Sequence, residues 1–193
     1  MAEAVDERIA QMPEGLWTQP DIDLSSLGLT DGDEAVRRVR NPARLEYDYT
    51  PGLATTRFLR AIEQKRLVGE RCPETGKVYV PPRGMSPVSG LPTTEQVELS
   101  DHGTVTSFCV VNLQFTGLVQ EVPYVSALIL PDGADIPIYG LIQEIPFDQI
   151  TAGLRVQAVW VPDEELTTSF ENIKWWKPSG EPDADPASYA DYV

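Results

Sequence analysis

Hydrophobic residues recur at helical spacing in one stretch of the chain, with charged residues between them. The four positions are Leu53, Phe58, Leu59 and Ile62. Thr50 and Pro51 precede this run; threonine is a favoured N-cap, and proline is tolerated at the first helical position. The pattern therefore predicts a helix that opens at Thr50-Pro51 and ends near Arg66.

From Glu95 onward the pattern changes to the alternation that is typical of β-strands. The expected strands cover residues 96–99, 104–113, 122–130, 136–142, 154–161 and 170–176. Pro137 indicates an edge position or a bulge, because proline cannot donate to a sheet ladder. Five or six strands of this length predict a small closed barrel.

Between the helix and the barrel, two tight turns repeat one design around two short expected strands, 67–71 and 77–80. Each has a small polar residue, two spacers, another small polar residue and a glycine, which supplies the positive φ that such a turn needs. The turns are Cys72-Pro73-Glu74-Thr75-Gly76 and Ser86-Pro87-Val88-Ser89-Gly90. This layout is that of a zinc knuckle.

Only Cys72 remains at the four positions where zinc ligands are expected; Thr75, Ser86 and Ser89 occupy the others. Neutral hydroxyls do not replace thiolates around Zn²⁺. We interpret the segment as a ribbon shape that has lost its metal. The alternative is two ordinary Pro/Gly turns.

The pattern divides the chain into five segments. They are an N-terminal arm (1–50), the helix with its lead-in strand (51–70), the ribbon-like segment (71–93), the barrel (94–178) and an acidic tail that we expect to be mobile (179–193). No apolar run approaches the ~20 residues of a membrane span. The start of the chain is acidic and lacks a hydrophobic region, and its two cysteines lie far apart, so we expect a cytoplasmic protein without disulfides.

The distribution of charge along the chain indicates one candidate binding segment. The chain has a formal net charge of −15, which disfavours sequence-independent binding to phosphate backbones. Residues 51–90 nevertheless hold seven bases against three acids. A basic segment in an acidic protein is a candidate anion site, although the same charges could form a solvated helix face.

The order of several short motifs resembles one known family. The motifs are Tyr79-x-Pro81-Pro82-Arg83, Gly103-Thr104-Val105, Pro123-Tyr124-Val125 and Gly153-Leu154-Arg155-Val156. Together with the helix and the two turns, they resemble the DUF35 family over residues 53–178, and the N-terminal arm lies outside the resemblance. The resemblance implies a mainly β fold: an N-terminal helix, a degenerate zinc ribbon and an OB-fold barrel of five to six strands.

The same resemblance implies a non-catalytic accessory subunit of a thiolase-superfamily complex, either a thiolase or a thiolase-like retro-aldolase of lipid or aromatic acid metabolism. This subunit would help to bind acyl-CoA, the substrate of the complex, and would stabilise its partner. It would hold no cofactor of its own. A heterotetramer is the expected assembly, because thiolase-like partners are commonly dimers. Sequence does not choose between thiolysis, retro-aldol cleavage and condensation.

CoA carries several phosphates, so a cluster of arginine and lysine suits it. The expected phosphate contacts are Arg71, Lys77 and Arg83, and the expected apolar or stacking contacts are Tyr79, Phe115 and Tyr124. The alternative is that these cations form internal salt bridges with Glu70 and Glu74. Two adjacent tryptophans, Trp175 and Trp176, point to opposite faces of a strand. We expect one of them to fill the barrel, and we take both, with Trp17 of the arm, as candidates for a partner interface.

No self-contained catalytic motif is present in the sequence. We expect His102 in a turn, Cys109 as a buried small residue, and Cys72 as a remnant ligand rather than a nucleophile. Two other functions stay open. One is an OB-fold protein that binds single-stranded nucleic acid, although its basic groove would have only Arg155, Lys174 and Lys177. The other is a stand-alone enzyme that uses Cys72.

Overall fold

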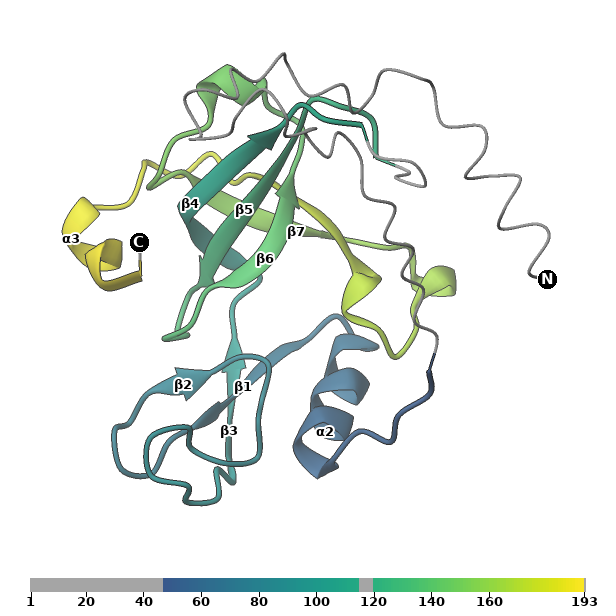
Figure 1. Ribbon diagram of the computed structural model, residues 1–193, viewed down its shortest axis with the longest axis vertical. Coiled ribbons are helices and arrows are strands. Elements are labelled where there is room, and N and C mark those ends of the chain that lie inside the picture. The colour runs from purple at the N-terminus through teal and green to yellow at the C-terminus, as the bar shows by residue number, and fades with distance from the viewer. Residues whose placement is uncertain (1–46, 115–119, 193) are drawn as a thin grey trace, which may run out of the picture. The chain divides into compact units, whose positions relative to one another are not determined.

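The computed structural model describes residues 47–114 and 120–192, and the chain divides into two compact units, Met1–Asp48 and Tyr49–Val193. Every described helix and strand lies in the second unit (Figure 1). None of the described helices combines the length and apolar composition that crossing a membrane requires. Residues 1–46 of the expected arm, with Trp17, lie outside the described residues.

Helix α2 (Leu53–Ile62) confirms the expected helix, with a different start and end. Its N-cap is Gly52, and no side chain caps it. It ends at Ile62 rather than near Arg66, because Lys65 has a positive φ of 56°, which no α-helix accommodates. The buried residues of α2 follow the helical period and form the face that contacts strand β1: Ala54, Phe58, Ala61 and Ile62.

A three-stranded antiparallel sheet follows α2, in the order β2-β1-β3. Its strands are β1 (Leu67–Arg71), β2 (Val78–Tyr79) and β3 (Glu95–Leu99). A Cβ atom on Gly69 would lie 2.6 Å from the Val78 side chain, so glycine is needed where β2 approaches β1.

The remaining strands close into a five-stranded barrel in the order β4-β5-β6-β8-β7, which confirms the predicted fold class (Figure 1). They are β4 (His102–Val111), β5 (Tyr124–Pro131), β6 (Ile138–Ile142), β7 (Arg155–Trp160) and β8 (Ile173–Pro178). Val105, Ile129, Val156 and Trp176 are fully or almost fully buried in the core. Trp176 is therefore the tryptophan that fills the barrel, as one of the pair was predicted to do.

Strand β4 contains the main departure from the predicted pattern. Its pairing with β5 shifts between Val105 and Ser107, so that Thr106 is an extra residue in a β-bulge. Beyond the bulge, Phe108 pairs with the buried Ala127, and Cys109 turns to the outer face. The prediction of a buried Cys109 is therefore wrong: its side chain is exposed.

Strands β6 and β8 are joined by a single parallel pair, Ile142 with Trp176. The rest of β6 has no partner on that side among the described strands. Gly140 of β6 faces Trp176, and a Cβ atom there would lie 2.5 Å from the indole ring. The barrel therefore closes tightly at one point and leaves a groove between β6 and β8 elsewhere.

The described structure contains five shorter elements. They are η2 (Phe147–Gln149), η3 (Asp163–Glu165), η4 (Phe170–Asn172), α3 (Pro186–Tyr189) and η5 (Ala190–Tyr192). Both α3 and η5 fall in the segment that the sequence analysis treats as a mobile tail. In the structure Tyr189 is buried, Ala184 N–H donates to Gly153 O at 2.9 Å, and Tyr192 Oη donates to Asp135 at 3.1 Å.

Candidate functional site

The two turns of the ribbon-like segment have the same backbone hydrogen bonds. In each, the glycine N–H donates to the carbonyl oxygen of the first residue at 2.9 Å: Gly76 to Cys72, and Gly90 to Ser86. The N–H of that first residue donates to the carbonyl oxygen five positions later, at 2.8 Å in both turns. The glycines have φ values of 72° and 71°. The repeat predicted from sequence is therefore a repeat of structure.

Cys72 and Ser86, the first residues of the two turns, meet in the interior. The Cys72 thiol donates to Ser86 Oγ at 3.1 Å, and Thr75 N–H donates to Cys72 Sγ at 3.4 Å. When Cys72 ionises, its thiolate accepts a hydrogen bond from the Ser86 hydroxyl, and this contact is the largest cause that lowers the pKa of Cys72 from 9.0 to about 7; burial opposes it.

These donors do not fit zinc. One thiol and three hydroxyls offer a single strong ligand, whereas a structural zinc site needs four. Among residues 47–114 and 120–192, no group of three or more His, Cys, Asp or Glu side chains is placed to hold a metal ion. Thr75 and Ser89 instead accept hydrogen bonds from the N–H groups of Lys77 and Leu91, at 3.3 and 3.4 Å.

Glu70, which was considered from sequence only as a salt-bridge partner, supports the second turn. Its side chain is 1% exposed, and its Oε2 accepts from Gly84 N–H at 3.0 Å and from Thr93 Oγ1 at 2.7 Å. Arg57 Nη1 lies 3.7 Å from the other carboxylate oxygen, which accepts no hydrogen bond. A buried carboxylate thus fixes both ends of the segment that carries the second turn.

Of the three cations expected at a CoA site, one is held by other described residues of the chain and two are not. Arg71 is engaged, since it donates to Glu95 and to the carbonyl oxygen of Gly76, both at 2.9 Å. Lys77 and Arg83 are exposed, and neither has an ion pair within the described part of the chain. Two of the three cations are therefore available to an anionic ligand.

The aromatic residues expected beside those cations lie in different parts of the chain. Tyr79 is buried in β2, where it is 6% exposed. Tyr124 is half-buried at the start of β5, in the barrel. Phe115 lies outside the described residues. The three cations lie in the ribbon-like segment and Tyr124 lies in the barrel, so one CoA site made of all six residues stays a prediction.

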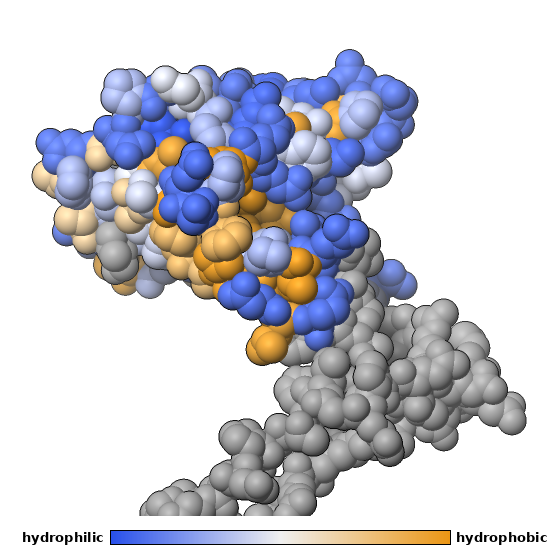
Figure 2. All heavy atoms as spheres, turned by 90° about the horizontal axis from the view of Figure 1, so that it is seen from above, coloured by the Kyte–Doolittle hydropathy of each residue, from blue (hydrophilic) through white to orange (hydrophobic). Residues whose placement is uncertain are grey.

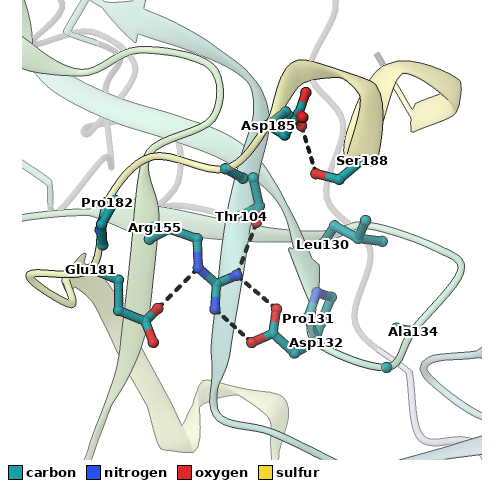
Figure 3. Close-up of a pocket in the computed structure, with 12 residues that line it drawn as sticks. Thr104, Leu130, Pro131, Asp132, Ala134, Arg155, Glu181, Pro182, Asp185 and Ser188 are labelled. Atoms are coloured by element: carbon teal, nitrogen blue, oxygen red, sulfur yellow. Dashed lines mark hydrogen bonds and ion pairs between the residues drawn. The ribbon is translucent and has the colours of Figure 1, made fainter.

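Arg155, a residue of the motifs described above, lines a pocket of about 550 Å³ together with the C-terminal segment (Figure 3). Its guanidinium donates to both oxygens of Asp132 at 2.7 and 2.6 Å, to Glu181 at 2.9 Å and to Thr104 at 2.9 Å. The hydrogen bonds with Asp132 raise the pKa of Arg155 above its ordinary value, and burial opposes them. Two carboxylates already compensate this charge, so an anion would have to displace one of them.

A second pocket, of about 360 Å³, lies in the groove between β6 and β8. Its lining is mostly apolar: Tyr139, Gly140 and Leu141 from β6, Ile173 and Trp176 from β8, and Phe170 from η4, with Lys174 as the cation. OB-fold proteins commonly bind ligands on the face of their second and third strands. Here these are β5 and β6, and both contribute to the pocket. Tyr139, which the sequence analysis did not single out, is 75% exposed at this groove.

Trp175, expected at a partner interface, is half-buried on the outer face of β8. Its Nε1 donates to Glu144 at 2.9 Å, and the Lys174 ammonium lies 5.7 Å from the centre of its ring. Trp176, in contrast, is 1% exposed and lies in the core.

Large hydrophobic side chains also reach the surface elsewhere. On the face seen in Figure 2, hydrophobic residues gather in a patch bordered by hydrophilic ones. Apart from Tyr139, the described residues of this kind include Leu113 and Phe147 near the barrel loops, and Met85, Val88 and Leu91 in the second turn.

Comparisons with known proteins match both the sequence and the fold. A family model described as "ChsH2, C-terminal OB-fold domain" matches residues 96–161. A "DUF35 domain-containing scaffold protein" of Methanocaldococcus jannaschii is 34% identical over 100 residues, which are 51% of this chain and 70% of that protein.

Two solved structures are similar. One is an "Ltp2-ChsH2(DUF35) aldolase"; its TM-score is 0.51 at 23% identity, and the match covers 68% of this chain and 99% of that one. The other is a Sulfolobus solfataricus protein of unknown function from the DUF35 family, with a TM-score of 0.48 at 18% identity and coverage of 66% and 84%. The first of these likenesses shows the fold.

Proposed function

This chain belongs to the DUF35 family, and from that premise we propose that it is an accessory subunit of a thiolase-superfamily complex. The observation that carries the proposal is its 34% identity to a protein described as a DUF35 scaffold. The similar structure called "Ltp2-ChsH2(DUF35) aldolase" joins a DUF35 protein to an aldolase by name, which favours a catalytic partner of that kind. The partner would hold the catalytic residues and would set the reaction.

The interior of the ribbon-like segment supports a non-catalytic role. Cys72, the candidate nucleophile, is fully buried and engaged with Ser86, so a substrate cannot reach its sulfur in this conformation. A lowered thiol pKa without access does not make a nucleophile. The buried pair instead fills the space at the centre of the two turns.

The proposed role includes binding of acyl-CoA. The exposed cations Lys77 and Arg83 are free to contact its phosphates, whereas Arg71 is held by Glu95. The apolar groove beside Tyr139 has the lining that an acyl chain requires. Substitutions of the two cations should therefore affect binding of the CoA phosphates, and substitutions in the groove should affect binding of the acyl chain.

The first experiment isolates the chain from its host under gentle conditions, identifies its companions by mass spectrometry and measures metal content in the same sample. We expect a stoichiometric thiolase-superfamily protein. Recovery of nucleic acid in its place would support the OB-fold alternative, and recovery of the chain alone would show that the family describes its fold but not its function.

The second experiment measures acyl-CoA affinity of the complex formed with that partner. Arg83→Glu should weaken binding about tenfold, the effect of losing one charge-assisted contact. Arg60→Glu is the matched control, because Arg60 is an exposed arginine of α2 that already pairs with Glu63. Tyr139→Ala should weaken binding of long acyl-CoA more than binding of free CoA. Unchanged affinity in both Arg83→Glu and Tyr139→Ala would remove acyl-CoA binding from this chain.

A further inference from the structure

The second turn of the ribbon-like segment and the residue on each side of it expose three large hydrophobic side chains within seven residues. Met85 is 56% exposed, Val88 is 69% exposed and Leu91 is 49% exposed. We call these three residues the apolar tip. Exposed apolar residues that stand singly are ordinary, but a cluster on one turn marks a contact surface.

The first turn shows that the fold does not require an apolar tip. The two turns have the same hydrogen bonds, and an offset of fourteen residues relates them, as Cys72 is related to Ser86. At that offset, the equivalents of Met85, Val88 and Leu91 are Arg71, Glu74 and Lys77. Charged residues thus occupy these positions in one turn and apolar residues occupy them in the other, with the same backbone geometry. The turn therefore does not need apolar residues at these positions in order to fold.

The apolar tip is also held in place before any contact is made. Ser86 Oγ accepts from Val88 N–H and from Ser89 N–H, both at 3.3 Å, and Met85 forms a β-bridge with Pro92. The buried Glu70, through Gly84 and Thr93 as described above, anchors the ends of this turn. A surface ordered in advance loses little conformational entropy on binding.

We propose that the apolar tip is a docking surface for the catalytic subunit of the complex, a proposal that rests on the proposed function. The partner would offer an apolar socket with acidic groups at its rim. Acidic groups are expected because Arg83, two residues before Met85, is exposed and has no ion pair among the described residues, whereas Arg71 is already paired with Glu95.

A second copy of this chain does not suit the apolar tip. Two-fold symmetric contact through the apolar tip would bring the exposed Arg83 of one copy close to that of the other. Each copy also carries a net charge of −15, so the whole molecules repel one another. The charges therefore favour a different chain as the occupant.

The test replaces residues of the apolar tip with those that the first turn carries at the same positions. Val88→Glu and Leu91→Lys are chosen because Glu74 and Lys77 show that this turn geometry accepts both side chains. Glu74→Lys is the matched control, since it makes a larger charge change on the equivalent turn. The thermal unfolding midpoint of each variant establishes that it is folded, and Val88→Ala serves as a milder form should Val88→Glu fail to fold.

The probe is the thiolase-superfamily protein identified with the wild-type chain, purified and titrated by calorimetry. Val88→Glu and Leu91→Lys should each weaken binding at least about tenfold, as expected for a charge placed in an interface core, and Val88→Ala about fivefold. Glu74→Lys should stay within about twofold of the wild type.

Three outcomes would overturn the proposal. Wild-type affinity in Val88→Glu and Leu91→Lys would overturn the docking surface and leave the proposed function standing. The absence of any thiolase-superfamily partner for the wild-type chain would overturn both. A wild-type dimer in sedimentation equilibrium that Val88→Glu dissociates would make a second copy the occupant of the apolar tip.

Discussion

At the scale of single residues, the contact between Cys72 and Ser86 has a measurable consequence. Because the hydrogen bond with Ser86 is the largest cause of the lowered pKa of Cys72, the Ser86→Ala variant should titrate at a higher pH than the wild type. The ultraviolet absorbance of the thiolate reports this pKa. Both proteins should carry Cys109→Ala, so that only one thiol titrates.

The same contact predicts how stability depends on pH. The pKa of Cys72 is about 7 in the folded protein and 9.0 for an ordinary thiol, so the unfolded chain binds more protons between these values. Ionisation of Cys72 should therefore add stability as the pH rises from about 7 to 9, and this contribution should be lost as the pH falls through about 7. Urea unfolding of the Cys109→Ala protein should show this increase in the free energy of unfolding between about pH 7 and 9. Adding Ser86→Ala should make the increase smaller. Equal pH dependence in both proteins would contradict the assignment.

Gly140 shows how one residue controls the closure of the barrel. A methyl group there would lie 2.5 Å from the Trp176 ring and 2.7 Å from Ile129. Gly140→Ala should therefore lower the free energy of unfolding by about 1–3 kcal/mol, the usual cost of overpacking a core. Gly52→Ala is the control, because a methyl group at Gly52 meets nothing within 4 Å. Chemical denaturation measures both, and an equal loss in the two variants would rule out the steric explanation.

Residue-level prediction from sequence failed where a bulge changes the register. Alternation along β4 places Cys109 on the buried face only if the strand is regular, and the extra residue Thr106 moves it to the outer face. A bulge leaves no reliable mark in the hydrophobic pattern, because it depends on pairing with a distant strand. His102, expected in a turn, begins β4 for a similar reason: its pairing with Gln157 is a tertiary contact.

At the scale of elements, the ribbon-like segment can be tested by restoring its ligands. The triple variant Thr75→Cys/Ser86→Cys/Ser89→Cys would provide four thiols at the positions of a zinc site. Zn²⁺ should then raise the thermal midpoint of the variant, since binding to the folded state alone adds about 4 kcal/mol at a thousandfold excess over Kd. The wild type should respond neither to Zn²⁺ nor to EDTA.

Calorimetry and metal analysis would check this prediction on both proteins. Failure of the triple variant to bind zinc while it remains folded would mean that the two turns repeat a hydrogen-bond pattern without the geometry of a metal site. A wild type that loses stability in EDTA would contradict the interpretation of Thr75, Ser86 and Ser89 as remnant positions.

Elements that depend only on the local sequence pattern were predicted well. Elements that depend on contacts with distant parts of the chain were not. The residues of β1 and the glycine-containing turns after Cys72 and Ser86 follow from strand propensity and turn chemistry alone. The docking of 181–192 does not, because it depends on Arg155 and Gly153, which are distant in sequence. The acidic composition of this segment suggested mobility, yet Glu181 is one of two carboxylates that pair with the barrel residue Arg155.

At the scale of the whole molecule, the family resemblance predicted the fold. Neither the resemblance nor the composition predicted which residues of the candidate site are free. The order of motifs predicted the barrel, but it could not show that Glu95 engages Arg71 or that Tyr79 is buried. Those facts depend on strand pairing. The groove beside Tyr139 was missed because it results from incomplete pairing of β6 with β8, which no single strand encodes.

Net charge leads to a prediction about assembly. Two isolated chains of net charge −15 repel each other, most strongly at low ionic strength, where screening is weak. The isolated chain should therefore sediment as a monomer of 21.4 kDa at low salt. With the thiolase-superfamily partner, which we expect to be a dimer, it should form a complex of two copies of each chain, because a two-fold symmetric partner offers two equivalent surfaces. Sedimentation equilibrium at low and high salt tests both statements. A dimer of the isolated chain at low salt, or a complex with one copy per partner dimer, would contradict this account of how charge and symmetry set the assembly.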